Sequence, residues 1–135
     1  MQPRIRYFSS VGVAILIGYA LILPQPVKAD PIVGTWRGNG IMKPSSGDRE
    51  KVRCKMRFSK MSEKVFSFNA TCAATSGNIS QYGEVNKVKG NRYIGTFYNN
   101  KNNVSGNIRV VVNGRSQSIS VSSSKGKGRM SLRKQ

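Results

Sequence analysis

Hydrophobic and polar residues alternate along most of the chain after residue 30. The clearest alternation lies in the segment REKVRCKMRF, residues 49–58. Its even positions are apolar from Val52 to Phe58. Its odd positions carry five cations, which we call the basic row: Arg49, Lys51, Arg53, Lys55 and Arg57. Because side chains of a β-strand point alternately to two faces, the segment predicts a strand with one apolar face and one cationic face.

Seven further segments show strand patterns and are separated by turn sequences. They are IVGTWRGNGI, VFSFNATCAA, SGNISQYGEV, NRYIGTFYN, VSGNIRVVVN, QSISVSSS and GRMSLRK. The connecting sequences are rich in Asn and Gly, which tolerate the positive φ angles of tight hairpins. No segment has a helical period. The pattern therefore predicts an all-β fold, a small antiparallel up-and-down β-barrel of about eight strands, with a β-sandwich as the alternative.

The two cysteines, Cys54 and Cys72, predict the register of one hairpin. When the segments around them fold about SKMSEK so that paired residue numbers sum to 126, Phe58 faces Phe68 and Cys54 faces Cys72. One register thus aligns both the apolar rows and the thiols. We predict a structural disulfide. A redox-active pair is the alternative, but the chain has no Cys-x-x-Cys and no histidine to activate a thiolate.

The N-terminus has the pattern of a cleavable secretory signal. A short basic stretch precedes an uncharged apolar run at 11–23, two prolines follow it, and VKA ends at Ala29. An uncleaved anchor is the alternative, but a spanning helix needs about 20 apolar residues, and this run is shorter. We therefore predict a signal peptide over 1–29 and a single domain over 30–135, with no transmembrane segment after cleavage.

The predicted mature chain is strongly basic. The whole chain has a formal net charge of +18, and removing the signal removes three cations and no acid, which leaves +15. Such a charge attracts anionic partners over long range. For a periplasmic or secreted protein, these are lipid headgroups, lipopolysaccharide, acidic polysaccharides and released nucleic acid. The alternative is that the basic composition only keeps the protein soluble.

The side chains available for catalysis or metal binding are few. There is no histidine, and the only acids are Asp30, Asp48, Glu50, Glu63 and Glu84. Acid–base catalysis uses His or paired carboxylates at defined separations, and zinc and haem sites need His, Cys or Met ligands. The chain also lacks a phosphate-binding glycine loop. We expect a protein that is not an enzyme and that has no cofactor and no metal site.

The triplet Gly34-Thr35-Trp36, with the only tryptophan of the chain, resembles the start of the first strand in lipocalins and related calycins. The resemblance implies a closed barrel in which a late basic residue packs over the indole. Arg129 and Arg133 lie in the last predicted strand.

A broader resemblance extends over most of the mature domain. The motifs that carry it are Trp36-x-Gly38-x-Gly40, GDREKVRCK, CAATSG, GNRYIGTFYN, VSGNI and QSISVSS. In this order they resemble a family of small exported proteins of alphaproteobacteria that has no assigned activity. This resemblance implies export and a β fold, and it carries over no catalytic residue.

The leading functional hypothesis is a non-enzymatic binding protein for an anionic polymer or lipid surface of the cell envelope. In a closed meander the last strand pairs with the first, so the basic row, Arg37, Arg129 and Arg133 would point outward on neighbouring strands. The outward residues across the hairpin include no carboxylate to neutralise them. Nucleic acid is less favoured because the cationic face has no aromatic residues for base stacking.

Two alternatives remain. The first is a lipocalin-like carrier of a small apolar ligand, because the inward residues Trp36, Met56, Phe58, Phe66 and Phe68 could line a pocket or fill it. The second is a periplasmic protein-interaction or inhibitor module, although no inhibitory loop motif is present. The sequence does not predict the oligomeric state.

Overall fold

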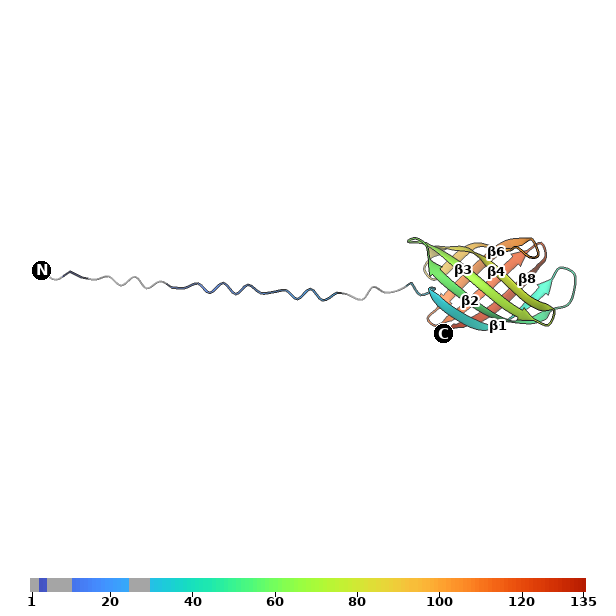
Figure 1. Ribbon diagram of the computed structural model, residues 1–135, viewed down its shortest axis with the longest axis horizontal. Helices are drawn as coiled ribbons and strands as arrows, with labels where there is room; N and C mark the ends of the chain where they lie inside the picture. Colours follow the sequence, from blue (N-terminus) through green and yellow to red (C-terminus); the bar gives the residue numbers. More distant parts are fainter. Residues whose placement is uncertain (1–2, 5–10, 25–29) are drawn as a thin grey trace.

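The computed structural model describes residues 3–4, 11–24 and 30–135. Residues 30–135 contain eight β-strands and no helix. The strands are β1 (Gly34–Pro44), β2 (Glu50–Lys60), β3 (Val65–Ala74), β4 (Gly77–Lys89), β5 (Arg92–Asn99), β6 (Val104–Asn113), β7 (Ser116–Ser123) and β8 (Gly126–Lys134). Figure 1 shows them wound around a common axis.

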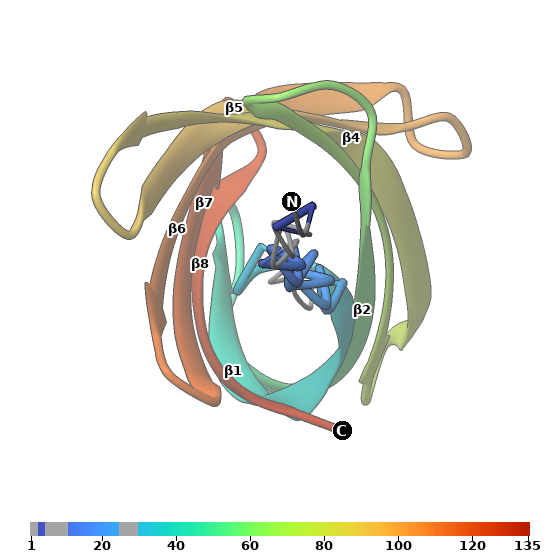
Figure 2. The same ribbon diagram turned by 90° about the vertical axis from the view of Figure 1, so that its left-hand side faces the viewer.

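Each strand pairs antiparallel with the next, and β8 pairs with β1, so the sheet closes into a barrel. Figure 2 shows the closed ring along its axis. The predicted up-and-down barrel is thus confirmed, and the sandwich alternative is not formed. Closure leaves none of the eight strands with an unpaired edge.

The apolar run of the predicted signal has no regular secondary structure over residues 11–24 and is exposed. Within the described ranges, no helix is long and apolar enough to cross a membrane. The predicted cleavage point at Ala29 lies outside the described residues, and the signal peptide stays a prediction.

The predicted hairpin register is confirmed. Cys54 is paired with Cys72 across β2 and β3, Phe58 is paired with Phe68, and the two cysteines form a disulfide with Cα atoms 4.1 Å apart. The two phenylalanine rings have centroids 5.6 Å apart. The bridge therefore fixes one hairpin at the point where its inward side chains also pack.

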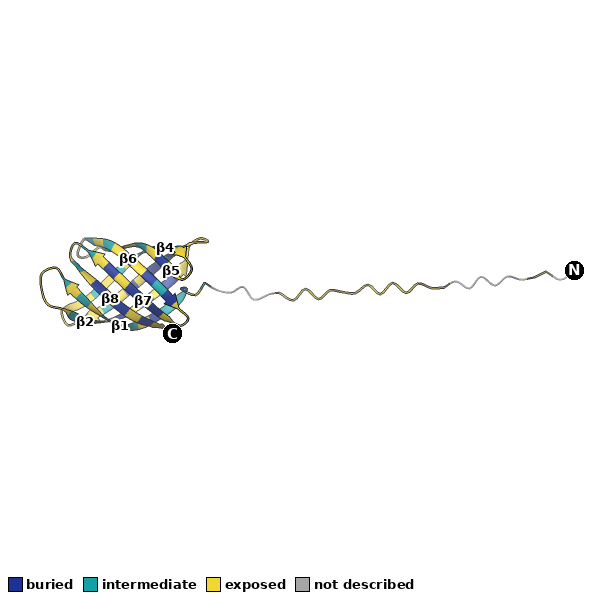
Figure 3. Cartoon of the chain, turned by 180° about the vertical axis from the view of Figure 1, so that it is seen from behind, coloured by how far each residue is buried: buried dark blue, intermediate teal, exposed yellow. Residues whose placement is uncertain are grey.

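The inward row of every strand faces the barrel interior, and Figure 3 shows buried and exposed residues alternating along the strands. The five residues predicted to line a pocket or to fill the core are all buried: Trp36, Met56, Phe58, Phe66 and Phe68. They belong to one apolar cluster that also includes Tyr93, Leu132 and Ile32. Ile32 precedes β1, so the chain before the first strand contributes to the core.

Two glycines allow the closest approach between β1 and β8. A Cβ atom on Gly38 would lie 2.0 Å from the backbone oxygen of Ser131, and one on Gly40 would lie 2.2 Å from that of Arg129. Any larger residue would push the two strands apart. Glycine at both inward positions therefore permits the sharp curvature that brings the first strand against the last.

The strands that extend furthest beyond their predicted ends are β1 and β4. β1 continues through Lys43 and Pro44, which we assigned to a loop, because these residues pair with Lys127 and Gly126 of β8. β4 continues to Lys89, beyond the predicted turn at Asn86, because it pairs with β5. In both cases cross-strand pairing extends the strand into sequence with turn-like composition.

Candidate functional site: a basic outer face

The strand order brings the predicted cations of three strands onto one outer face. Arg37 in the middle strand β1 is paired with Lys55 of β2 on one side and with Arg133 of β8 on the other. All three side chains are exposed. The remaining members of the basic row and Arg129 are exposed on the same face. Arg49 lies just before β2, while the other four members lie within it.

A second cationic pair lies on this face and was missed by the sequence analysis. Lys43 of β1 is paired with Lys127 of β8, and both side chains are exposed. We assigned the two residues to connecting loops. Their positions in the sequence could have identified them. Lys43 lies an even number of residues after Arg37, and Lys127 an even number before Arg129, so each lysine shares the outward face of its arginine.

No carboxylate lies opposite the basic row on β3, all of whose residues are described. Arg57 is paired with Asn69, Lys55 with Thr71 and Arg53 with Ala73. Glu50, at the start of β2, has the opposite parity, is half-buried, and accepts a hydrogen bond from the Ser76 hydroxyl at 2.9 Å. The cations of the basic row are therefore not neutralised from the β3 side of the sheet.

The ion pair found among the described residues lies at the end of β2, beyond the basic row. Lys60 Nζ is 3.0 Å from the Asp30 carboxylate. The hydrogen bond to Asp30 raises the pKa of Lys60 above its usual value of 10.5, against a smaller opposing effect of desolvation. Asp30 thus contacts a cation that does not belong to the predicted binding face.

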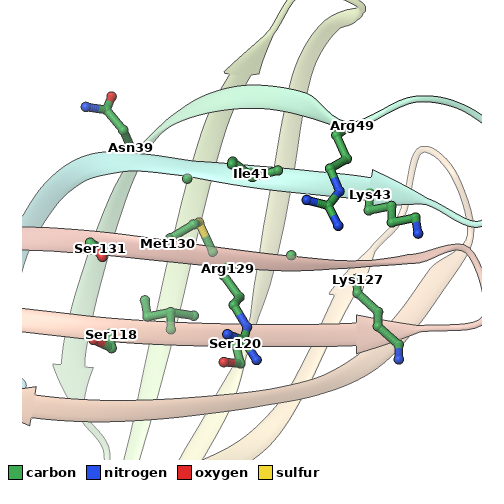
Figure 4. Close-up of a pocket in the computed structure, with 13 residues that line it drawn as sticks. Asn39, Ile41, Lys43, Arg49, Ser118, Ser120, Lys127, Arg129, Met130 and Ser131 are labelled. Atoms are coloured by element: carbon green, nitrogen blue, oxygen red, sulfur yellow. The ribbon is translucent and has the colours of Figure 1, made fainter.

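The outer face is hollowed into a groove of about 740 Å³ across β1, β8 and β7. Figure 4 shows the side chains that line it. Four are cations and four are small polar residues: Lys43, Arg49, Lys127 and Arg129, and Asn39, Ser118, Ser120 and Ser131. Ile41, which is 46% exposed, lies between them. We call this hollow the β1–β7 groove.

The groove brings together only some of the predicted residues. Arg49 and Arg129 line it, whereas Lys51 and Arg53 line a second hollow on the other side of β1, which shares Asn39, Gly40 and Ile41. Arg37, Lys55, Arg57 and Arg133 lie on the same outer face but line neither hollow. The inward glycine Gly40 lies where the two hollows meet.

The expectation that Arg129 or Arg133 packs over the indole is wrong. Both arginines point outward, whereas Lys134, with the parity of Leu132, points inward and places Nζ 5.6 Å from the centroid of the Trp36 ring. A basic residue near the end of the chain does contact the indole, as the calycin resemblance implies. The alternation along β8 assigns that contact to Lys134.

The interior offers a smaller space than the groove. The predicted pocket residues pack against each other near the end of the barrel where β1 begins. A cavity of about 170 Å³ lies at the opposite mouth. Its inward lining includes Met42, Glu50, Gln81, Phe97 and Asn99. Pockets that hold drug-sized ligands measure about 300–1,000 Å³, so this mouth fits only a smaller molecule.

Within residues 3–4, 11–24 and 30–135, no three His, Cys, Asp or Glu side chains lie close enough together to hold a metal ion. Both cysteines are disulfide-bonded.

No protein-family model and no curated protein matches the chain, so the resemblance to the alphaproteobacterial family stays a prediction. Solved structures with the same barrel do match. A redesigned β-barrel, mFAP1, bound to DFHBI, superposes with a TM-score of 0.65 at 15% identity, covering 76% of this chain and 94% of the other. The M. tuberculosis protein Rv2717c superposes with a TM-score of 0.50 at 11% identity, covering 78% of this chain and 93% of the other.

A de novo designed fluorescence-activating β-barrel gives a TM-score of 0.60 at 14% identity, covering 78% of this chain and 94% of the designed one. At these identities the likeness concerns the fold alone. It places the chain among small closed β-barrels, both designed and natural.

Proposed function

We propose that this protein is a non-enzymatic, exported binding protein whose basic outer face engages an anionic component of the cell envelope. The observation that carries the proposal is the row Lys55–Arg37–Arg133, three exposed cations across three adjacent strands with no carboxylate opposite on β3. The Cys54–Cys72 disulfide is compatible with an oxidising, exported location.

The spacing of the cations suits a polymer or a charged surface better than a single small anion. Along one strand, outward residues repeat at about 6.6–6.8 Å, and adjacent strands lie about 4.8 Å apart. The face is thus a two-dimensional array of positive charge. Binding to such an array depends on many weak contacts, and we expect it to weaken steeply with salt.

The test replaces all five residues of the basic row by Gln. The matched control replaces five cations elsewhere and so changes the net charge equally: Lys64, Lys87, Lys89, Arg92 and Lys101. Binding to phosphatidylglycerol vesicles, lipopolysaccharide and heparin is measured at several salt concentrations. We expect the basic-row variant to lose roughly tenfold or more in affinity, with a shallower salt dependence, and the control to lose less.

Two results would overturn the proposal. The first is a basic-row variant that binds all three probes as tightly as the wild type. The second is a control variant that loses as much affinity as the basic-row variant, because net charge alone would then explain the binding.

A second candidate function is the binding of a small molecule at the barrel mouth. It is supported by the cavity lined by Glu50, Gln81 and Asn99, and by the similarity to mFAP1, a barrel bound to DFHBI. The buried aromatic residues fill the other end, which limits the ligand to a small one. Native mass spectrometry of the protein from its own envelope tests this function, and a spectrum without any co-purified small molecule would contradict it.

A further inference from the structure

We propose that the β1–β7 groove binds a single chain of a linear acidic polysaccharide and contacts both its carboxylates and its hydroxyls. This inference rests on the proposed function and narrows its partner class. It depends on the order in which cations and small polar residues follow each other across the groove.

The groove contains an uncharged hydrogen-bonding row beside its cations. Asn39 of β1, Ser131 of β8 and Ser118 of β7 are paired in one line across three strands. The side-chain hydrogen bonds found among the described residues do not use these three side chains or Ser120. Their donors and acceptors face solvent in the groove and are available to a ligand.

The next two rows along the strands carry positively charged side chains. Ile41, Arg129 and Ser120 form the neighbouring line, and beyond it lie Lys43 and Lys127, paired with each other. Successive rows are about 6.7 Å apart, which is two residues along a strand. A ligand lying along the groove therefore passes an amide-and-hydroxyl row and then two cationic rows.

This combination of rows matches a polymer that carries hydroxyls and carboxylates on the same chain. The Ser hydroxyl both donates and accepts hydrogen bonds, and the Asn side chain has an NH2 donor and a carbonyl acceptor. Sugar hydroxyls, which also donate and accept, can bond to either. Lys and Arg supply charge-assisted hydrogen bonds to carboxylates. Neither the polar side chains nor the cations alone would distinguish such a polymer from other polyanions.

The other polyanions fit the groove less well. A flat bilayer surface does not fill a hollow of the outer face, and Ile41 is the only large apolar side chain exposed among the described residues that line the groove. Single-stranded nucleic acid is held by base stacking on aromatic residues, and the same set of lining residues includes no aromatic one. A polysaccharide chain needs neither feature.

The test removes the hydroxyls and keeps every cation. Ser118, Ser120 and Ser131 are replaced by Ala together, and the matched control replaces Ser80 of β4 and Ser105 of β6, which are exposed and do not line the groove. The probes are polygalacturonate, which carries hydroxyls and carboxylates, and polyacrylate, which carries carboxylates alone. Circular dichroism verifies that each variant is folded.

We expect the triple variant to bind polygalacturonate roughly tenfold more weakly, since three hydroxyls lose their hydrogen bonds, and to bind polyacrylate within about twofold of the wild type. The control should change neither affinity. On the wild type, binding to polygalacturonate should persist at about 0.5 M salt, where screening removes binding to polyacrylate. This second measurement needs no variant.

The outcomes separate the inference from the proposed function. If the triple variant binds both polymers as the wild type does, or if salt abolishes both interactions together, the hydroxyl row is not used and the inference fails while the basic face stands. If the wild type binds neither polymer at low salt and no vesicle or lipopolysaccharide, the proposed function fails as well.

Discussion

Lys134 Nζ lies over the Trp36 ring, 5.6 Å from its centroid, and the two residues are paired across β8 and β1. The same ammonium donates a hydrogen bond to the Pro31 carbonyl at 3.2 Å, and Trp36 Nε1 donates one to the Ile32 carbonyl at 2.9 Å. The first strand, the last strand and residues 30–33 are thus joined at one end of the barrel. Ile32 is fully buried there and closes that end.

Replacement of Trp36 by Phe should test this junction. The variant loses the hydrogen bond to Ile32 and leaves a cavity in a fully buried position, so we expect the free energy of unfolding to fall by about 2–4 kcal/mol. Urea denaturation provides the measurement. The control Lys127→Met changes an outward lysine of β8 and should cost under about 0.5 kcal/mol. A Trp36→Phe variant as stable as the wild type would show that the junction does not hold the barrel end.

The disulfide should contribute to stability mainly by constraining the unfolded chain. Cys54 and Cys72 are 18 residues apart, and a loop of this length is worth about 3 kcal/mol in the chain-entropy model. We expect the Cys54→Ala, Cys72→Ala double variant to lose about that amount in urea denaturation. The reduced wild type is the control and should unfold at the same urea concentration. Equal stability of the oxidised protein and the double variant would contradict a structural role.

The sequence predicts the strand pairings that depend on side-chain parity. In the predicted hairpin, in which paired residue numbers sum to 126, Cys54 faces Cys72 and Phe58 faces Phe68. This register was predictable because only one register buries both apolar rows. Parity also predicted that Arg37, Arg129 and Arg133 would point outward. It could not predict where strands end, because pairing with β8 carries β1 through Lys43, a residue in turn-like sequence.

The groove and the closed end could not be predicted because both depend on contacts between distant segments. The closed meander predicts that β8 lies between β7 and β1, but only the register of both pairings brings Ser118, Ser131 and Asn39 into one line. Each is an ordinary outward residue in its own strand. Ile32 has the parity of Trp36 in the predicted first strand, but its place before β1 depends on long-range contacts. Trp36 donates a hydrogen bond to the Ile32 carbonyl, and Lys134, from the end of the chain, donates one to the neighbouring Pro31 carbonyl.

Gln117 is a polar residue in the inward row of β7, and its replacement should stabilise the protein. The side chain is buried, and both its amide nitrogen and its amide oxygen lack a hydrogen-bond partner within the described part of the chain. An unsatisfied buried group costs about 1–3 kcal/mol, so we expect Gln117→Met to raise the free energy of unfolding by about 1 kcal/mol or more. A loss of stability in urea denaturation would show that the amide is hydrogen-bonded. The control Ser118→Ala changes the next, exposed residue.

Tyr93 should make the protein sensitive to alkaline pH. Burial, with a smaller contribution from Asp30, raises the pKa of Tyr93 above its usual value of 10.0. Because the unfolded chain loses this proton first, the stability that neutral Tyr93 contributes is complete below pH 10.0 and falls as pH rises through the pKa of the folded state. The informative quantity is the difference in stability between the wild type and Tyr93→Phe, because contributions common to both proteins cancel. That difference should shift in favour of the variant above pH 10.0, and parallel profiles would contradict the prediction.

The pair Lys43 and Lys127 should contribute to polyanion binding although neither belongs to the basic row. They are paired across β1 and β8, and both line the β1–β7 groove beside Arg129. We expect the Lys43→Gln, Lys127→Gln variant to bind heparin more weakly and to reduce the slope of log Kd against log salt concentration by up to about 2, one for each lost contact. The matched control Lys64→Gln, Lys101→Gln removes the same charge from residues outside the groove and should leave the slope nearly unchanged. If the two variants reduce the slope equally, the groove has no special part in binding and the cations act only through the net charge of the protein.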